Sequence, residues 1–135
     1  MENFSASNLL KLIPLLIVIV LVIPKGNVSA TKKVVRVQND LGEVTLMVHC
    51  RSKDDDVGVH YLSNGNYTTW PFGDSLIRTI FWCTIKWNGE KEDFTVYDSL
   101  RDRVRCWLKC WWSVRPDGAY SFNEKTQKYE KLYAW

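Results

Sequence analysis

Residues 106–122, with the sequence CWLKCWWSVRPDGAYSF, decide the fold of this chain. The stretch holds two cysteines and three tryptophans, which are Cys106, Cys110, Trp107, Trp111 and Trp112. Each tryptophan can bury a large apolar area, and a disulfide through either cysteine would fix the segment against another part of the chain. Pro116-Asp117-Gly118 predicts a turn between two strands. The stretch therefore predicts the anchored core of a β-protein, and it contains no catalytic motif.

The first thirty residues have the pattern of a signal peptide. Residues 12–23 are almost wholly apolar, and Val28-Ser29-Ala30 offers the small residues of a cleavage site. Pro14 interrupts the apolar run, which is shorter than the ~20 residues of a membrane-spanning helix. We therefore expect a removed signal peptide at 1–30, secretion from the cell, and a mature extracellular domain at 31–135.

The mature segment is long enough for one domain with a single core. It has 105 residues and a net charge of +2, because Lys11, Lys25 and Glu2 leave with the signal peptide and the full chain carries +3. A nucleic-acid partner usually requires a clustered basic face, so none is expected.

All four cysteines lie in the mature segment, and passage through an oxidising compartment predicts two disulfides. The chain has no CxxC motif, so its cysteine spacing does not suit a zinc site. Four cysteines allow three pairings, and the sequence leaves all three open. We favour nested pairing of Cys83 with Cys106 and of Cys50 with Cys110. Cys50 and Cys83 lie on predicted core faces, and the gap from Cys106 to Cys110 is an awkward loop for a direct bond.

Alternating apolar and polar residues from position 33 onward predict strands. The first two, up to Cys50, are expected to pair as antiparallel neighbours, and Asn88-Gly89 predicts the tight turn of a hairpin over 79–97. No helical stripe of three turns is present. The pattern predicts an all-β, disulfide-stabilised β-sandwich of about seven to eight strands. The expected strands are 33–38, 44–50, 58–62, 67–72, the two of the 79–97 hairpin, 110–115 and 119–123, and 129–135 could pair with an edge or cover it.

Three segments together are similar to a known family. They are LGEVTLMVHCRSKDDDVGVHYLSNG from residue 41, FWCTIKWNGEKEDFTVYDSLRDR from residue 81 and CWWSVRPDGAYSFN from residue 110. With the four cysteines, they closely resemble the plant self-incompatibility S-protein family over about residues 35–135. The resemblance implies a small secreted β-sandwich with two disulfides. It also implies a ligand for cell–cell recognition, because founding members act as pistil-side determinants of self-pollen rejection.

Two charged loops are the expected contact sites for a partner. Loops on a rigid sandwich can vary without disturbing the core, and charged hydrogen bonds give specificity and association rate. Residues 51–57 include three consecutive acids, and residues 98–105 form a nearly balanced, solvated charge run. We hypothesise that residues 51–56 and 98–103 of these loops bind a plasma-membrane receptor on pollen or other plant cells. The candidate contact residues are Lys53, Asp54, Asp55, Asp56, Asp98, Arg101, Asp102 and Arg103.

Two other functions are alternatives to the receptor-ligand hypothesis. His49 and His60 could form the acid/base pair of a secreted ribonuclease, but neither lies in a recognisable catalytic motif, so no enzymatic activity is expected. Tryptophans beside lysines in residues 107–112 would suit a membrane-active defence protein. The acidic triplet 54–56 lacks the alternate spacing of a calcium loop. No cofactor, metal ion or small-molecule substrate is expected, and the protein is expected to be a monomer.

The mature segment contains one predicted N-glycosylation site. Asn66-Tyr67-Thr68 is its one Asn-x-Ser/Thr sequon, and it directly follows a predicted turn. We expect a glycan on Asn66.

Overall fold

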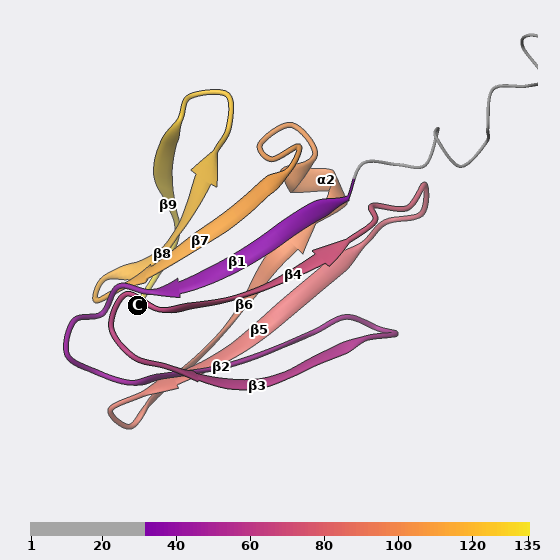
Figure 1. Ribbon diagram of the computed structural model, residues 1–135. Coiled ribbons are helices and arrows are strands. Elements are labelled where there is room, and N and C mark those ends of the chain that lie inside the picture. The colour runs from indigo at the N-terminus through magenta and orange to yellow at the C-terminus, as the bar shows by residue number, and fades with distance from the viewer. Residues whose placement is uncertain (1–31) are drawn as a thin grey trace, which may run out of the picture. The chain divides into compact units, whose positions relative to one another are not determined.

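The computed structural model describes residues 32–135, which form a sandwich of two β-sheets (Figure 1). The predicted signal peptide lies outside the described residues. The all-β sandwich is confirmed, and the ninth strand is the C-terminal segment, which pairs with its neighbour β8. The elements are β1 (Lys33–Asn39), β2 (Leu46–Arg51), β3 (Asp56–Leu62), β4 (Tyr67–Phe72), β5 (Ile80–Trp87), β6 (Glu90–Asp98), the single helical turn α2 (Ser99–Asp102), β7 (Lys109–Arg115), β8 (Gly118–Asn123) and β9 (Lys128–Ala134).

The predicted antiparallel pairing of the first two strands is wrong. The five-stranded sheet has the order β4-β1-β7-β8-β9, whereas β2 lies in the other sheet, of order β3-β2-β5-β6. Asn39 explains the crossing, because its buried side-chain amide donates to the carbonyls of Val44 (2.7 Å) and Leu62 (2.9 Å). These bonds hold the chain where it leaves β1 and crosses to the second sheet.

The core lies between the sheets and is filled by alternate residues of each strand. Val35 and Val37 of β1 and Val48 of β2 are almost completely buried. Trp112 of β7 is 1% exposed, and its indole Nε1 donates to the carbonyl of Val96 in the opposite sheet (2.7 Å). A buried indole with its N–H satisfied contributes a large apolar area without an unpaired donor. Trp107, in contrast, is 56% exposed, so it is not the core anchor that the sequence suggests.

All four cysteines form disulfides, but the nested pairing is wrong. Cys50 and Cys83 are directly opposite each other on β2 and β5, and they are bonded. Cys106 is bonded to Cys110 four positions along, with their Cα atoms 5.2 Å apart. The prediction that Cys50 and Cys83 face the core was right, and cross-strand neighbours on one face are close enough to bond.

The strands connect at two ends of the sandwich, which differ in character. We call the end with residues 52–55, 73–79, 99–108 and 124–127 the disulfide end, and the end with residues 40–45, 63–66, 88–89 and 116–117 the turn end. Strand β1 runs from the disulfide end to the turn end. Near its start, the backbone N–H of Val34 donates to the carbonyl of Leu108 (2.7 Å), and at its end the backbone N–H of Asn39 donates to the carbonyl of Asn66 (2.9 Å). In Figure 1 the C-terminus marks the turn end, and α2 lies toward the disulfide end.

Candidate functional site

Exposed apolar side chains gather at the disulfide end. Of the nine large hydrophobic residues that are exposed within residues 32–135, six lie there. They are Leu76, Ile77, Leu100, Val104, Trp107 and Leu108, and Leu76 is fully exposed. An exposed apolar cluster of this kind is typical of an interaction surface. The loops that carry it are the 73–79 loop, the turn around α2 and the small disulfide ring.

The turn around α2 is held by its first residue. Asp98 is the N-cap, and its Oδ1 accepts the backbone N–H of Leu100 (3.0 Å). Its carboxylate also receives two bonds from the guanidinium of Arg78, and these hold the pKa of Asp98 below its usual value. The helical turn continues to Cys106, which donates its backbone N–H to the carbonyl of Asp102 (2.9 Å). Asp98 therefore fixes both this turn and the loop that carries Arg78.

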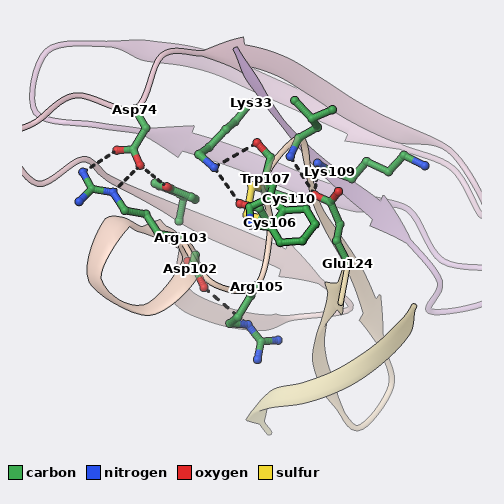
Figure 2. Close-up of a disulfide and its surroundings, with 12 residues drawn as sticks. Lys33, Asp74, Asp102, Arg103, Arg105, Cys106, Trp107, Lys109, Cys110 and Glu124 are labelled. Atoms are coloured by element: carbon green, nitrogen blue, oxygen red, sulfur yellow. Dashed lines mark hydrogen bonds and ion pairs between the residues drawn. A yellow bond between two sulfur atoms is a disulfide. The ribbon is translucent and has the colours of Figure 1, made fainter. Parts of the chain in front are cut away.

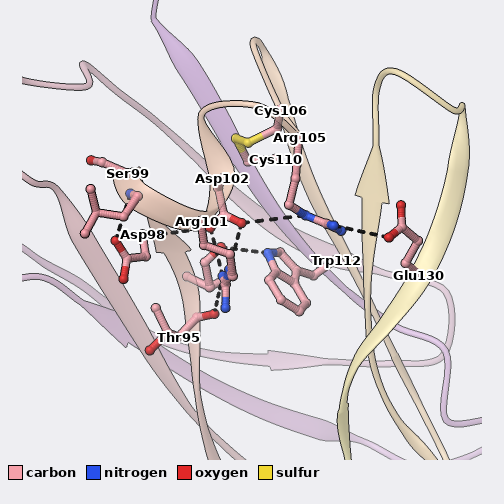
Figure 3. A network of polar contacts seen from close by, with 12 residues as sticks. Thr95, Asp98, Ser99, Arg101, Asp102, Arg105, Cys106, Cys110, Trp112 and Glu130 are labelled. Atoms are coloured by element: carbon pink, nitrogen blue, oxygen red, sulfur yellow. Dashed lines mark hydrogen bonds and ion pairs between the residues drawn. A yellow bond between two sulfur atoms is a disulfide. The ribbon is translucent and has the colours of Figure 1, made fainter.

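Asp102 is the centre of an internal charge network (Figure 3). It is 3% exposed, and its carboxylate accepts the backbone N–H of Asp98 (2.8 Å) and two N–H groups of Arg101 (2.7 and 2.8 Å). Arg105 lies 3.8 Å from the same carboxylate and also pairs with Glu130 on β9 (3.2 Å). The expectation of a solvated loop is therefore wrong here, because Asp102 is buried as the counter-ion of two arginines and cannot be an exposed contact residue.

Arg101 connects this network to both sheets. Its Nη2 donates to the carbonyl of Thr95 on β6 (2.8 Å), and its Nη1 donates to the hydroxyl of Tyr133 on β9 (2.8 Å). Burial opposes the charge of Arg101, but the bonds to Asp102 outweigh it and raise the pKa of the guanidinium. Arg101 thus ties the turn around α2 to β6 and β9.

Asp74 fastens the 73–79 loop to this turn. Its carboxylate accepts hydrogen bonds from Arg103 Nε (2.9 Å), Tyr97 Oη (2.7 Å) and Ser99 Oγ (2.9 Å). Burial alone would raise the pKa of Asp74, but these three donors lower it to about 2. Burial and the neighbouring carboxylate together raise the pKa of the Tyr97 hydroxyl. No sequence motif marks Asp74, which is the one acidic residue of the 73–79 loop.

The ring closed by Cys106 and Cys110 is held from both sides (Figure 2). Oε1 of Glu124 accepts the three successive backbone N–H groups of residues 107–109, at 2.8, 2.8 and 2.6 Å. Lys33 Nζ donates to the carbonyls of Cys106 (2.8 Å) and Trp107 (3.1 Å), and burial lowers the pKa of its ammonium group. The backbone groups of the ring are thus satisfied internally, while the side chains of Trp107 and Leu108 are exposed.

The predicted 51–56 loop lies at the same end. Lys53, Asp54 and Asp55 are exposed, and Asp56 lies 2.9 Å from Nε2 of His49. The backbone N–H of Gly58 and then His49 lower the pKa of Asp56. A cleft of about 750 Å³ opens here and is lined by the 52–57 segment, by Ser75 and residues 77–81, and by Trp70 and Phe72. The structure thus brings the two predicted loops to one end of the molecule, with the 73–79 loop between them.

A family model matches nearly all of the residues that the structure describes. The model described as "Plant self-incompatibility protein S1" matches residues 34–135. The chain belongs to this family. S-protein homolog 2 of Arabidopsis thaliana is 35% identical over 111 residues, which cover 78% of this chain and 69% of that protein. S-protein homolog 29 of the same plant is 39% identical over 106 residues, covering 77% and 78%.

A solved structure supports the fold of this S1-family chain. It is that of an SPH (self-incompatibility protein homologue), described as one of a widespread family of small, highly stable, secreted proteins from plants. It superimposes with a TM-score of 0.64 at 23% identity and covers 80% of this chain and 97% of that one. The resemblance seen in the sequence and the sandwich fold are both confirmed.

The two histidines of this S1-family chain do not converge. His49 lies opposite Val59 on β3, so His60, the next residue, points to the other side of the sheet. His60 contacts the carbonyl of Val57 (3.0 Å) and His49 contacts Asp56. This arrangement does not suit a two-histidine acid/base pair. Within residues 32–135 no cluster of His, Cys, Asp and Glu could hold a metal ion, and no helix is long and apolar enough to cross a membrane.

The sequon residue lies at the turn end. Asn66 is exposed, and its side-chain amide donates to Ser63 Oγ (2.6 Å). It is adjacent to the end of β1, whereas the disulfide ring is adjacent to its start. Seven residues of β-strand separate the two positions by roughly 20 Å. The predicted glycan would therefore leave the disulfide end uncovered.

Proposed function

We propose that this chain is a secreted plant protein that acts as an extracellular ligand, and that its disulfide end binds a plasma-membrane receptor protein on pollen or other plant cells. Cell–cell recognition is the process it would serve, and self-pollen rejection is one form of it. The observation that carries the proposal is the gathering of six exposed apolar side chains on loops that are held by internal hydrogen bonds. The function needs no catalytic group, cofactor or metal ion.

The anchors of this surface would be Trp107 and Leu108. A tryptophan often dominates the binding energy of an interface, and an already ordered loop loses little conformational entropy on binding. Ile77 lines the cleft, and Leu76 is exposed beside it, so the apolar surface extends along the 73–79 loop. Together these four side chains form the proposed centre of the interface.

The charged candidates divide into two groups by their position. Lys53, Asp54 and Asp55 are exposed on the neighbouring loop and Asp56 at the start of β3, where charges act mainly on specificity and association rate. Arg103 is also exposed, although Asp74 orients it. Asp98, Arg101 and Asp102 would support the surface from within. Contact with the receptor is therefore assigned to the first group and to Arg103.

The test is binding to intact plant cells. The full chain is expressed with its signal segment, the oxidised protein is recovered from the medium, and labelled protein is offered to pollen and to vegetative protoplasts with unlabelled competitor. We expect saturable binding, weakened at least tenfold (about 1.4 kcal/mol) by the double substitution Trp107→Ser, Leu108→Ser. The matched control is Val59→Ser, Tyr61→Ser, which removes two exposed apolar side chains from β3. The proposal fails if no saturable site exists, or if both variants bind alike.

A second candidate function is a membrane-active defence protein. It is favoured by exposure of Trp107 and Leu108 beside the exposed Lys109, an arrangement that suits a membrane interface. Dye release from anionic vesicles tests this candidate. Release that disappears in the Trp107→Ser, Leu108→Ser variant would support it over the receptor ligand, and an absence of release would eliminate it.

A further inference from the structure

The outer face of the five-stranded sheet carries four cations and five aromatic rings. The cations are Arg36 on β1, Lys109 and Arg115 on β7, and Lys131 on β9. The rings are Tyr67, Trp111, Tyr120, Phe122 and Tyr129. These residues alternate along the strands with buried ones such as Val35, Trp112 and Ala119, so they point away from the core. We call this surface the cation–aromatic face.

One continuous row of contacts crosses all five strands. The guanidinium of Arg36 lies between the rings of Tyr67 on β4 (4.4 Å) and Trp111 on β7 (4.1 Å). Trp111 is followed by Phe122 on β8, at 6.0 Å between ring centroids, and Phe122 by Tyr129 on β9, at 5.2 Å. Rings that stack on a guanidinium hold it in place and leave its N–H edges as the groups that bind a carboxylate. The row therefore fixes a guanidinium on a broad sheet surface, with Nη2 of Arg36 also donating to Oε1 of Gln38 (2.9 Å).

The cations come in two pairs, each around one ring. Arg36 and Lys109 both lie over Trp111, at 4.1 and 5.0 Å. Arg115 and Lys131 both lie over Tyr120, at 4.1 and 5.8 Å. Like charges placed side by side on a sheet destabilise it unless an anion is near. An anionic ligand would therefore find one open pair, Arg36 with Lys109, and a second pair in which Lys131 is already partnered by Asp117.

Carboxylates are scarce on this face. None of the outward-pointing side chains of its five strands is acidic, and within residues 32–135 no ion pair joins Arg36 or Lys109 to a carboxylate. Two acids lie at its turn-end border. Asp117 pairs with Lys131 (2.8 Å), and Asp40 accepts a hydrogen bond from Ser113. At the other border, Glu124 accepts the backbone N–H of Lys109 (2.6 Å), but the side chains of Arg36 and Lys109 form no ion pair in the described part of the chain, so this pair is the more available of the two.

We propose that the cation–aromatic face binds an acidic polysaccharide with a carboxylate on each sugar, a polyuronate. Such a polymer offers regularly spaced carboxylates to both cation pairs, and the C–H groups of its sugar rings can pack on the aromatic side chains between them. Several weak contacts along one chain reinforce each other. This surface borders the disulfide end at Lys109, but none of its residues is among the proposed receptor contacts, so the inference does not depend on the receptor proposal.

Other anionic partners fit this face less well. A membrane surface would call for apolar side chains that protrude, whereas Trp111, Phe122 and Tyr129 are all partly buried in the row. A single-stranded nucleic acid binds by stacking its bases on free ring faces, but Arg36 or Arg115 already covers a face of Tyr67, Trp111 and Tyr120. Charge complementarity and partial burial together favour the polyuronate.

The experiment compares polymers and two matched variants. The full-chain product recovered from the medium is tested for binding to polygalacturonate, to the same polymer after complete methyl esterification, and to phosphatidylserine vesicles. We expect binding to the charged polymer that weakens as salt is raised, and none to the ester. Arg36→Gln, Lys109→Gln should bind polygalacturonate at least tenfold more weakly. Lys86→Gln, Lys91→Gln removes the same charge from two exposed lysines that face each other on the other sheet, and should stay within twofold of the natural protein.

Three outcomes would overturn the proposal. They are equal binding of the ester, equal losses in the two double variants, and binding to vesicles without binding to polygalacturonate. If Arg36→Gln disturbs folding, the pair Lys109→Gln, Lys131→Gln replaces it, because both lysines are exposed. Retention of full binding by that variant would equally overturn the proposal.

Discussion

The two ends of this sandwich connect strands in different ways. At the turn end, the β5–β6 connection needs only two residues, Asn88 and Gly89, whose φ angles of 44° and 77° form a tight turn by backbone chemistry alone. At the disulfide end, longer segments are held by buried or half-buried side chains, with Asp102, Asp74, Glu124 and Lys33 as their centres. Internal charges fix the loops of the disulfide end, and those loops present apolar side chains to solvent.

The largest expected effect is the loss of Asp102. Asp102→Ala should lower the free energy of unfolding by about 3–5 kcal/mol, because Arg101 and Arg105 would keep their charges without the carboxylate between them. At the turn end, Asp117→Ala removes an exposed carboxylate and should change stability little. Urea unfolding of both variants measures the contrast, and equal losses would show that the two ends are held alike.

The disulfide ring should contribute a smaller amount. Replacing Cys106 and Cys110 together by alanine should lower the free energy of unfolding by about 2 kcal/mol, because the closed loop is short. The Cys50–Cys83 bond closes a loop of 33 positions and should contribute about 4 kcal/mol. Thermal unfolding of each double variant provides the comparison. A larger effect from the short ring would mean that it does more than close its own loop.

Asp74 should make stability depend on acidity. Its pKa is about 2 in the folded protein and 3.8 is the ordinary value, so the carboxylate stabilises the fold fully above about pH 4 and loses this contribution as the pH falls toward 2. The contribution amounts to about 2 kcal/mol. Asp74→Asn should remove this part of the acid dependence, and Asp117→Asn should leave it in place. Unfolding curves from pH 5 to pH 2 would contradict the account if the natural protein and Asp74→Asn kept parallel profiles.

The smallest expected effect is local. Glu124→Ala should leave overall unfolding nearly unchanged but speed hydrogen exchange of the Trp107, Leu108 and Lys109 amides at least tenfold, because these N–H groups share one acceptor. The turn-end amide of Asn66, bonded to the carbonyl of Ser63, serves as the reference. Amides at 107–109 that exchange freely in the natural protein would show that the ring is not held as described.

The sequence predicted what depends on local pattern. Alternation placed Val48, Cys50 and Cys83 on core faces, and Asn88-Gly89 located a hairpin. The sequence did not predict features that depend on residues far apart in the chain. The pairing of Cys50 with Cys83 depends on β2 and β5 lying side by side. The burial of Asp102 depends on Arg101 and Arg105, which are themselves bonded to β6 and β9.

The candidate site could be predicted only in part. Both charged loops lie at the disulfide end, yet the residues that hold the 99–109 segment, Asp74, Lys33 and Glu124, lie far from it in the sequence and carry no motif. The exposure of Trp107 was also unpredictable, because its neighbour Trp112 is completely buried and the short disulfide ring separates their environments.

Glycan blocking tests the central claim that the disulfide end is the recognition surface. Ile77→Asn creates an Asn-Arg-Thr sequon at that end, and Glu90→Thr creates one at Asn88 in the turn end. Each secreted product is checked by mass for the added glycan and compared with the natural protein in binding to intact plant cells. The account predicts that the glycan from Ile77→Asn abolishes saturable binding, whereas the glycan from Glu90→Thr leaves it unchanged. Binding retained by the first and lost by the second would contradict it.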